Sequence, residues 1–174
     1  MTFEEIQYVS QVVAVLGILG SLVFVGLQIR QNTAIARAQV HQQLSDTFTV
    51  YLETLSNHSR VVFGGTSGSR TLEDLSDEEL LQFSFLMAGL FKIWENAYYQ
   101  YKSGFLTEHH WESNSKWMLT WFHMPGVQIW WRVRKDLFAG EFQDFLETSR
   151  RPQSGRPLPE ILRDAAKAAS TSSE

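Results

Sequence analysis

Residues 6–29 read IQYVSQVVAVLGILGSLVFVGLQI, and no charged side chain occurs among them. A helix needs about 20 predominantly apolar residues to cross the hydrocarbon of a bilayer, and this stretch is long enough. We therefore expect a transmembrane anchor over residues 1–30. A helical bundle domain over residues 31–149 and a Pro-rich linker with a mobile tail over residues 150–174 would follow it.

Two other interpretations of the apolar stretch stay open. A cleaved signal peptide has a basic start and an apolar core of about 7–15 residues. Here the start carries Glu4 and Glu5, the apolar core is longer, and the cleavage-like triplet at 36–38 lies beyond several polar residues. The third interpretation is a buried core helix of a soluble protein.

The basic residues near the anchor predict its direction in the membrane. None precedes the apolar stretch, whereas Arg30 and Arg37 follow it. Because Lys and Arg are enriched on the cytoplasmic side of membrane helices, the C-terminal domain is predicted to be cytoplasmic.

Small residues recur along one face of the anchor at spacings of four, three and four. Such a face lets a second membrane helix approach closely, so it is a candidate helix–helix interface in the membrane. Small residues are also common in membrane helices that have no partner, which is the alternative. The residues are Ser10, Ala14, Gly17 and Ser21.

No proline or glycine interrupts residues 27–60, so the anchor helix is predicted to continue into the aqueous domain. An apolar stripe at helical spacing gives this extension one buried face. The run GGTSGSR at 64–70 is then predicted to be a linker; it lacks the lysine and the spacing of a phosphate-binding loop. The stripe consists of Leu44, Phe48, Tyr51 and Leu55.

Local signals place the remaining helices. Ser76 followed by Glu79 forms a capping box that starts a helix, and Gly104 is suited to end it. A further helix is expected over 107–122. Pro125 favours the first turn of the next one, which is predicted to stop at Gly140. Because no segment alternates apolar and polar residues as a strand does, the fold class is predicted to be all-α, a bundle of three to five helices.

Composition excludes several functions. The formal net charge of −4 argues against nucleic acid as the main partner, because phosphate binding needs a basic face. Cysteine is absent, so thiolate catalysis and Cys-based zinc sites are excluded. No Glu-x-x-His, His-Glu-x-x-His or Gly-x-Ser-x-Gly motif occurs; His109 and Glu112 share a helical face but are too few for zinc. No cofactor and no metal site is predicted.

A polar group within an aromatic-rich helix is the main candidate for chemistry. Glu95 there could acquire a raised pKa and act as a base, or it could form a buried polar link to the first helix. The second role more often fixes helix register than performs chemistry. The residues of this possible link or pocket are Arg37, His41, Glu95, Asn96, Tyr98 and Tyr99.

Six tryptophans occur in the chain, and two of them are adjacent. Trp130 and Trp131 are predicted not to point into one core together, so one of them should reach a surface. With the neighbouring Arg132 and Arg134, this side of the helix is a candidate partner or lipid-headgroup surface. Plain packing in the bundle is the alternative for most of the tryptophans.

Three segments carry a resemblance: LVFVGLQIRQNTAIARA at 22–38, WENAYYQYKSGFL at 94–106 and PGVQIWWRVRKDLFAGEF at 125–142. Together they resemble a family of small uncharacterised bacterial proteins with one N-terminal transmembrane helix and a helical domain. The resemblance implies a bacterial inner-membrane protein and carries no activity. Related sequences tend to have Ser-Pro at the position of Ala139-Gly140; either pair suits a helix break.

These observations favour a non-enzymatic, single-pass membrane protein whose partners are the lipid bilayer and protein, either itself or a larger membrane complex. The alternative is a membrane-tethered ligand sensor or small enzyme with a pocket near Glu95. A closed bundle with Glu95 paired would favour the first function, and an apolar cavity reaching Glu95 the second.

Overall fold

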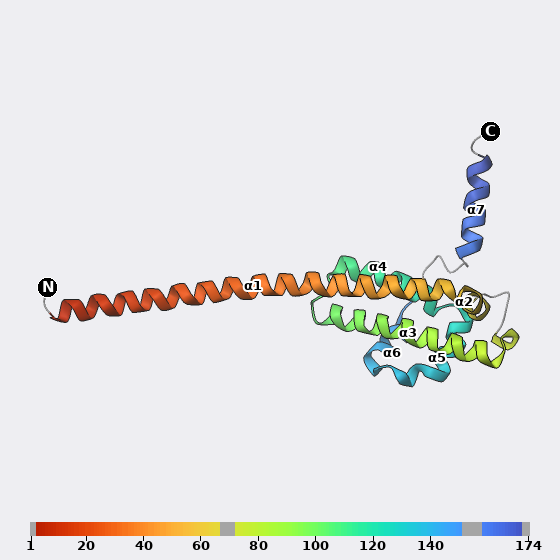
Figure 1. Ribbon diagram of the computed structural model, residues 1–174, viewed down its shortest axis with the longest axis horizontal. Coiled ribbons are helices and arrows are strands. Elements are labelled where there is room, and N and C mark those ends of the chain that lie inside the picture. The colour runs from red at the N-terminus through yellow and green to blue at the C-terminus, as the bar shows by residue number, and fades with distance from the viewer. Residues whose placement is uncertain (1–2, 67–71, 151–157, 172–174) are drawn as a thin grey trace. The chain divides into compact units, whose positions relative to one another are not determined.

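The computed structural model describes residues 3–66, 72–150 and 158–171. These residues form seven α-helices and two short 3-10 helices, with no strand among them, which confirms the all-α class (Figure 1). Contacts divide the chain within its first helix, into Met1–Gln42 and Gln43–Glu174. The elements are α1 (Phe3–Asn57), α2 (Ser59–Thr66), η1 (Leu72–Asp74), α3 (Asp77–Lys102), α4 (Glu108–Phe122), α5 (Pro125–Arg134), η2 (Lys135–Leu137), α6 (Gly140–Thr148) and α7 (Leu158–Thr171).

The first unit consists of the N-terminal part of α1. Among the described helices, α1 is the one long and apolar enough to cross a membrane, and it lies near the N-terminus. Its side chains over residues 13–29 are exposed, which disfavours a buried core helix. The length and composition suit a single membrane span or a signal sequence.

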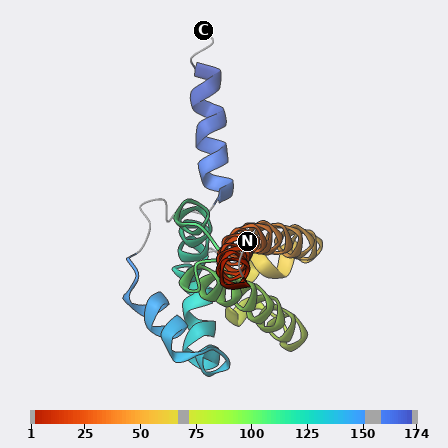
Figure 2. The same cartoon turned by 90° about the vertical axis from the view of Figure 1, so that its left-hand side faces the viewer.

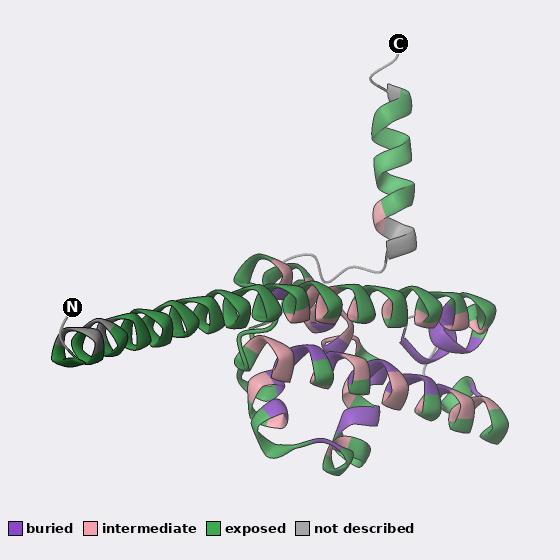
Figure 3. Ribbon diagram, turned by 60° about the vertical axis from the view of Figure 1, so that its left-hand side comes forward, coloured by how far each residue is buried: buried purple, intermediate pink, exposed green. Residues whose placement is uncertain are grey.

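The second unit is built around α3, which lies among α2, α4, α5 and the end of α1 (Figures 1 and 2). Its inward face supplies the centre of the hydrophobic core, so α3 is buried along one side and exposed along the other (Figure 3). From α1, the Tyr51 hydroxyl donates to the Leu86 carbonyl, and burial raises the pKa of Tyr51 to about 12. The end of α1, predicted to be an aqueous extension of the anchor with one buried face, therefore forms one side of the core.

Three predicted helix ends are confirmed. Ser76 and Glu79 form the capping box of α3, each side chain accepting a hydrogen bond from the other residue's backbone amide. Gly104 has φ +74°, and its amide and that of Phe105 turn back to carbonyls in the last turn of α3. This left-handed cap costs glycine no steric strain. Pro125 begins α5, where its missing N–H leaves no bond unmade.

The predicted linker at 64–70 is wrong in its first part. Gly64, Gly65 and Thr66 are buried and form the last turn of α2, while residues 67–70 lie outside the described residues. The reason is a close helix contact: a Cβ added to Gly126 of α5 would lie 1.5 Å from the Gly65 carbonyl oxygen. The glycines let two backbones meet; in this part of the run they do not loosen the chain.

The predicted stop at Gly140 is also wrong. Helix α5 ends at Arg134, η2 follows, and Gly140 begins α6 instead of ending α5. The chain leaves the helix because Phe138 turns into the core, where it is 5% exposed and its backbone is extended. Burial of this ring outweighs continued helix hydrogen bonding.

The C-terminal segment contains the helix α7 (Leu158–Thr171). The mobility predicted for the tail and the predicted domain limits at residues 30 and 149 stay predictions.

Candidate interaction surface and the predicted Glu95 site

The Glu95 carboxylate is paired on both oxygens within the second unit. One oxygen accepts from Lys92 Nζ at 2.7 Å, and the other accepts from the Ala139 backbone amide at 2.7 Å. Lys92 also donates to the Leu137 carbonyl at 2.6 Å and lies 4.6 Å from the centre of the Phe138 ring. Because Ala139 is the N-cap of α6, Glu95 places a negative charge at a helix N-terminus, where the helix dipole favours it.

The aromatic residues around Glu95 fill the space proposed for a pocket. Trp94 and Tyr98 are buried, at 1% and 8% exposure. The Tyr98 ring lies 5.7 Å from Phe142 and 5.1 Å from Phe145, centre to centre. These contacts favour close packing here over a ligand cavity.

The other residues of the predicted link lie in two different units. Arg37 is exposed and His41 partly buried, and both belong to Met1–Gln42. In the second unit, Asn96 is exposed and accepts from Gln100 Nε2 at 3.4 Å, and Tyr99 is partly buried. The direct partners of Glu95, Lys92 and Ala139, were not predicted, although the Lys92–Glu95 spacing of three residues is a recognisable helix pair.

The prediction that Trp130 or Trp131 reaches the surface is wrong, because both are buried, at 5% and 2% exposure. Helix α5 is covered on two sides, so adjacent side chains enter the core in different directions. Trp130 Nε1 donates to Ser84 Oγ of α3 at 3.1 Å, and Trp131 Nε1 donates to Glu147 Oε1 of α6 at 3.1 Å.

Arg132 and Arg134 are exposed, so only the basic part of the predicted headgroup surface is accessible. The nearby Lys135 donates to Glu147 at 3.0 Å. This bond, and then the Trp131 N–H, hold the pKa of Glu147 below its usual range.

An exposed apolar surface instead covers the outer sides of α3 and α5. We call it the α3–α5 face. Its members are large hydrophobic side chains outside the core: Leu81 (60% exposed), Phe85 (69%), Ile129 (46%), Val133 (75%) and Leu137 (47%).

Two bonds place the halves of this face side by side. The Trp130–Ser84 bond joins the residues adjacent to Ile129 and Phe85, and the Lys92–Leu137 bond joins α3 to the end of the α5–η2 segment. Spacings of four put Leu81 with Phe85, and Ile129 with Val133, on the outer stripe of each helix. Exposed apolar side chains gathered on neighbouring helices are typical of an interaction site.

Sequence reasoning missed this face, because the apolar run that contains Leu81 and Phe85 does not by itself show which of its side chains are exposed. The available signal was Lys92: it continues the Leu81–Phe85 stripe, and a lysine on a stripe indicates an exposed side.

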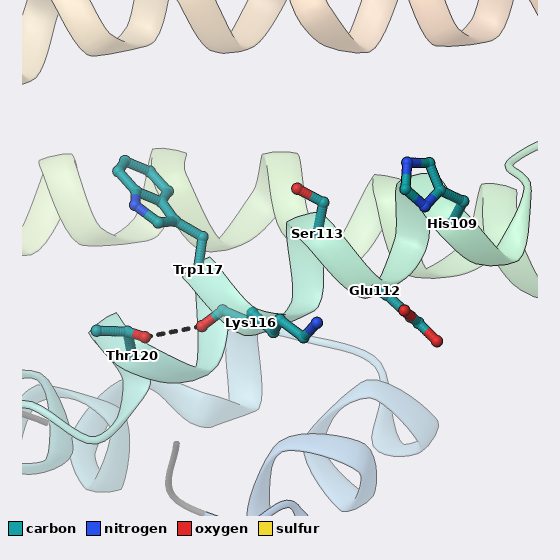
Figure 4. A pocket seen from close by; sticks show the side chains of 6 residues that line it. All are labelled: His109, Glu112, Ser113, Lys116, Trp117 and Thr120. Atoms are coloured by element: carbon teal, nitrogen blue, oxygen red, sulfur yellow. Dashed lines mark hydrogen bonds between the residues drawn. The ribbon is translucent and has the colours of Figure 1, made fainter. Parts of the chain in front are cut away.

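A shallow depression on α4 is a weaker candidate. Figure 4 shows His109, Ser113 and Trp117 on one side of the helix and Glu112 and Lys116 on another. Thr120, the remaining lining residue, donates to the Lys116 carbonyl at 2.8 Å. All six lining residues come from one helix, and the described part of the chain holds no group of three or more His, Asp or Glu side chains that could bind a metal ion.

No family model, curated protein or solved structure matches this chain.

Proposed function

We propose that this protein is a single-pass, membrane-anchored interaction protein whose helical domain binds protein through the α3–α5 face. The observation that carries the proposal is the exposure of five large apolar side chains on adjacent helices. Scattered single apolar residues are normal on a protein surface, but a joined group of them favours a partner surface.

The anchor supports self-association as the form of this interaction. The Ser10 and Ser21 hydroxyls donate to the Gln7 and Ile18 carbonyls of their own helix, so neither hydroxyl is left unsatisfied in hydrocarbon. A Cβ added to Gly17, between them, would meet nothing within 4 Å. This small-residue face suits close packing with the same face of another copy or with a helix of a membrane complex.

We assign the protein to the bacterial inner membrane with the domain in the cytoplasm. Arg30 and Arg37 after the apolar stretch support this direction, because no basic residue precedes the stretch. A reporter fused to the C-terminus that is active only in the cytoplasm tests the orientation. Activity of a reporter that works only outside the inner membrane would contradict it.

The alternative, a ligand sensor or enzyme at Glu95, has less support. Both Glu95 oxygens have partners, and Trp94 and Tyr98 are packed against other rings, which leaves the carboxylate a structural role. A catalytic base needs to reach a substrate proton.

The test is the native mass of the full chain extracted into nanodiscs. The mass should correspond to an oligomer or to a complex with a reproducible partner. Phe85→Asp should reduce the assembly, because it places a charge in the contact. Val50→Asp is the matched control: Val50 is 64% exposed and lies on α1, outside the α3–α5 face.

The same measurement should be made on a chain that ends at Arg150. This chain lacks α7, so α7 cannot mask the α3–α5 face in it. If both chains are monomers with nothing bound, the proposal is wrong. An assembly that Phe85→Asp leaves intact would exclude the α3–α5 face and leave the anchor as the contact.

A further inference from the structure

We infer that α7 is the built-in ligand of the α3–α5 face: it packs against this face of its own chain, and a protein partner must displace it. The inference uses the same surface as the proposed function and adds a second occupant. It depends on the amphipathic pattern of α7, on the match of lengths and on the reach of the connecting residues.

The sequence of α7 is amphipathic at helical spacing. Ile161, Leu162 and Ala165 fall on one stripe, and the opposite side carries charges of both signs. Leu162 is 59% exposed and Ala165 is also exposed. A helix of this length is marginal in water by itself, because most helical stability comes from packing of the apolar face. Burial of this stripe against another surface would stabilise α7.

The α3–α5 face offers exposed apolar side chains on two neighbouring helices. An amphipathic helix commonly buries its apolar stripe against such a surface. The exposed line on α3 from Leu81 to Lys92 is about 16 Å long, and α7 is about 21 Å long. The small Ala165 side chain allows close approach of backbones, while Ile161 and Leu162 supply the apolar area to bury.

The connection allows this contact within one chain. Helix α6 ends beside α5, because Glu147 bonds both Trp131 and Lys135. From Arg150, seven residues (151–157) reach at most about 25 Å, enough to pass around a helix about 10 Å wide. A tether this short raises the local concentration of α7 to the millimolar range, so contact within the chain is favoured over exchange with a second copy.

The composition of α7 argues against the lipid surface as its cover. Interfacial helices carry Lys and Arg on the polar side and Trp, Phe or Leu on the other. The sequence of α7 instead contains two acidic and two basic residues, and no aromatic residue occurs in it.

The absence of cysteine in the chain permits a clean test. Asp136→Cys, beside the face, and Arg163→Cys, on the polar side of α7, carry spin labels in the full chain in nanodiscs. Mixing the doubly labelled chain with an excess of unlabelled chain removes the distances between labels on different copies from the measurement. A narrow distance distribution is expected, and Phe85→Asp should broaden it whereas Val50→Asp should not. The backbone amides of α7 should exchange at least tenfold faster in the Phe85→Asp variant.

Three results of the distance measurement would overturn the inference. They are a broad distribution in the wild-type chain, a narrow one that is unchanged by Phe85→Asp, and a narrow one that disappears on dilution, which would assign α7 to a second copy. Contact of the Arg163→Cys label with a relaxation reagent confined to the lipid would also overturn it, in favour of the membrane.

The inference and the proposed function can fail separately. If α7 covers the face about nine-tenths of the time, removing residues 151–174 should strengthen partner binding or self-association about tenfold. An assembly that depends on Phe85, together with a broad label distribution, would refute the α7 contact alone. A narrow distribution with monomers in every chain would refute the proposed function alone.

Discussion

Replacement of Gly126 by alanine should destabilise the domain more than any other glycine-to-alanine change that can be compared with it. The new Cβ would lie 1.5 Å from the Gly65 carbonyl oxygen and 2.7 Å from the Gly65 carbonyl carbon. An ordinary contact needs about 3.5 Å, so the α2 and α5 backbones must separate by roughly 2 Å. No rotamer change can relieve a clash between two backbones.

The expected cost is about 3 kcal/mol, the upper part of the range for overpacked sites, because the shift also loosens Phe83 and Val127 near the contact. For a domain of about 100 residues this lowers Tm by roughly 10–20 °C. Tryptophan fluorescence of the full chain in nanodiscs measures it, since all six tryptophans lie between residues 94 and 131 and none is in the anchor.

Two other glycines calibrate this measurement. Gly140→Ala meets nothing within 4 Å, so its Tm should match the wild type or rise slightly, since alanine is the better helix former. Gly65→Ala would place its Cβ 2.4 Å from the Phe83 ring, which can move in part, so an intermediate loss is expected. If Gly126→Ala melted within about 2 °C of Gly140→Ala, the close helix contact would be refuted.

Three further changes are testable by the same fluorescence melts. Glu95→Ala should cost about 0.5–1.5 kcal/mol, because it removes a charged acceptor from the Ala139 amide, which is exposed and can bond water instead; an unchanged Tm would contradict this role. Glu147 has a lowered pKa, so it contributes stability above its unfolded value of 4.5 that is lost as the pH falls below it. Glu147→Gln should therefore reduce the loss of stability at low pH. If stability fell equally steeply in this variant, the Lys135 contact would be excluded as the cause of the loss. Tyr51 has a raised pKa, so its contribution is complete below pH 10 and is lost as the pH rises toward about 12. Tyr51→Phe should remove that alkaline loss, and its persistence would assign the loss to other groups.

Those parts of the fold that depend on neighbours in sequence could be predicted. The capping box at Ser76, the left-handed turn at Gly104 and the helix start at Pro125 each involve bonds within a few residues, so the residue types alone specify them. The long apolar helix is equally local, because length and composition define it.

Features that depend on packing between distant segments could not be predicted. Gly65 and Gly126 are 61 positions apart. A glycine can indicate either a flexible segment or a close contact between backbones, so the residue type alone does not distinguish the two. Trp130 and Trp131 both enter the core because α3 and α6 cover different sides of α5, and nothing near the pair in sequence indicates two covering helices.

The Glu95 site shows why a charged residue in an apolar helix is a poor guide to chemistry without its distant partners. Its nearer partner, Lys92, is three residues away and could be seen in the sequence, but the decisive one is the Ala139 amide 44 residues later. That amide is available because Phe138 turns into the core and ends the preceding helical segment. The carboxylate and the buried ring therefore support each other: Glu95 caps the helix that the turn at Phe138 begins, and Lys92 bonds Glu95 while its Nζ lies over the ring. Helix capping therefore accounts for the presence of Glu95 among aromatic residues. For this reason the exposed α3–α5 face, and not Glu95, is the stronger basis for a function.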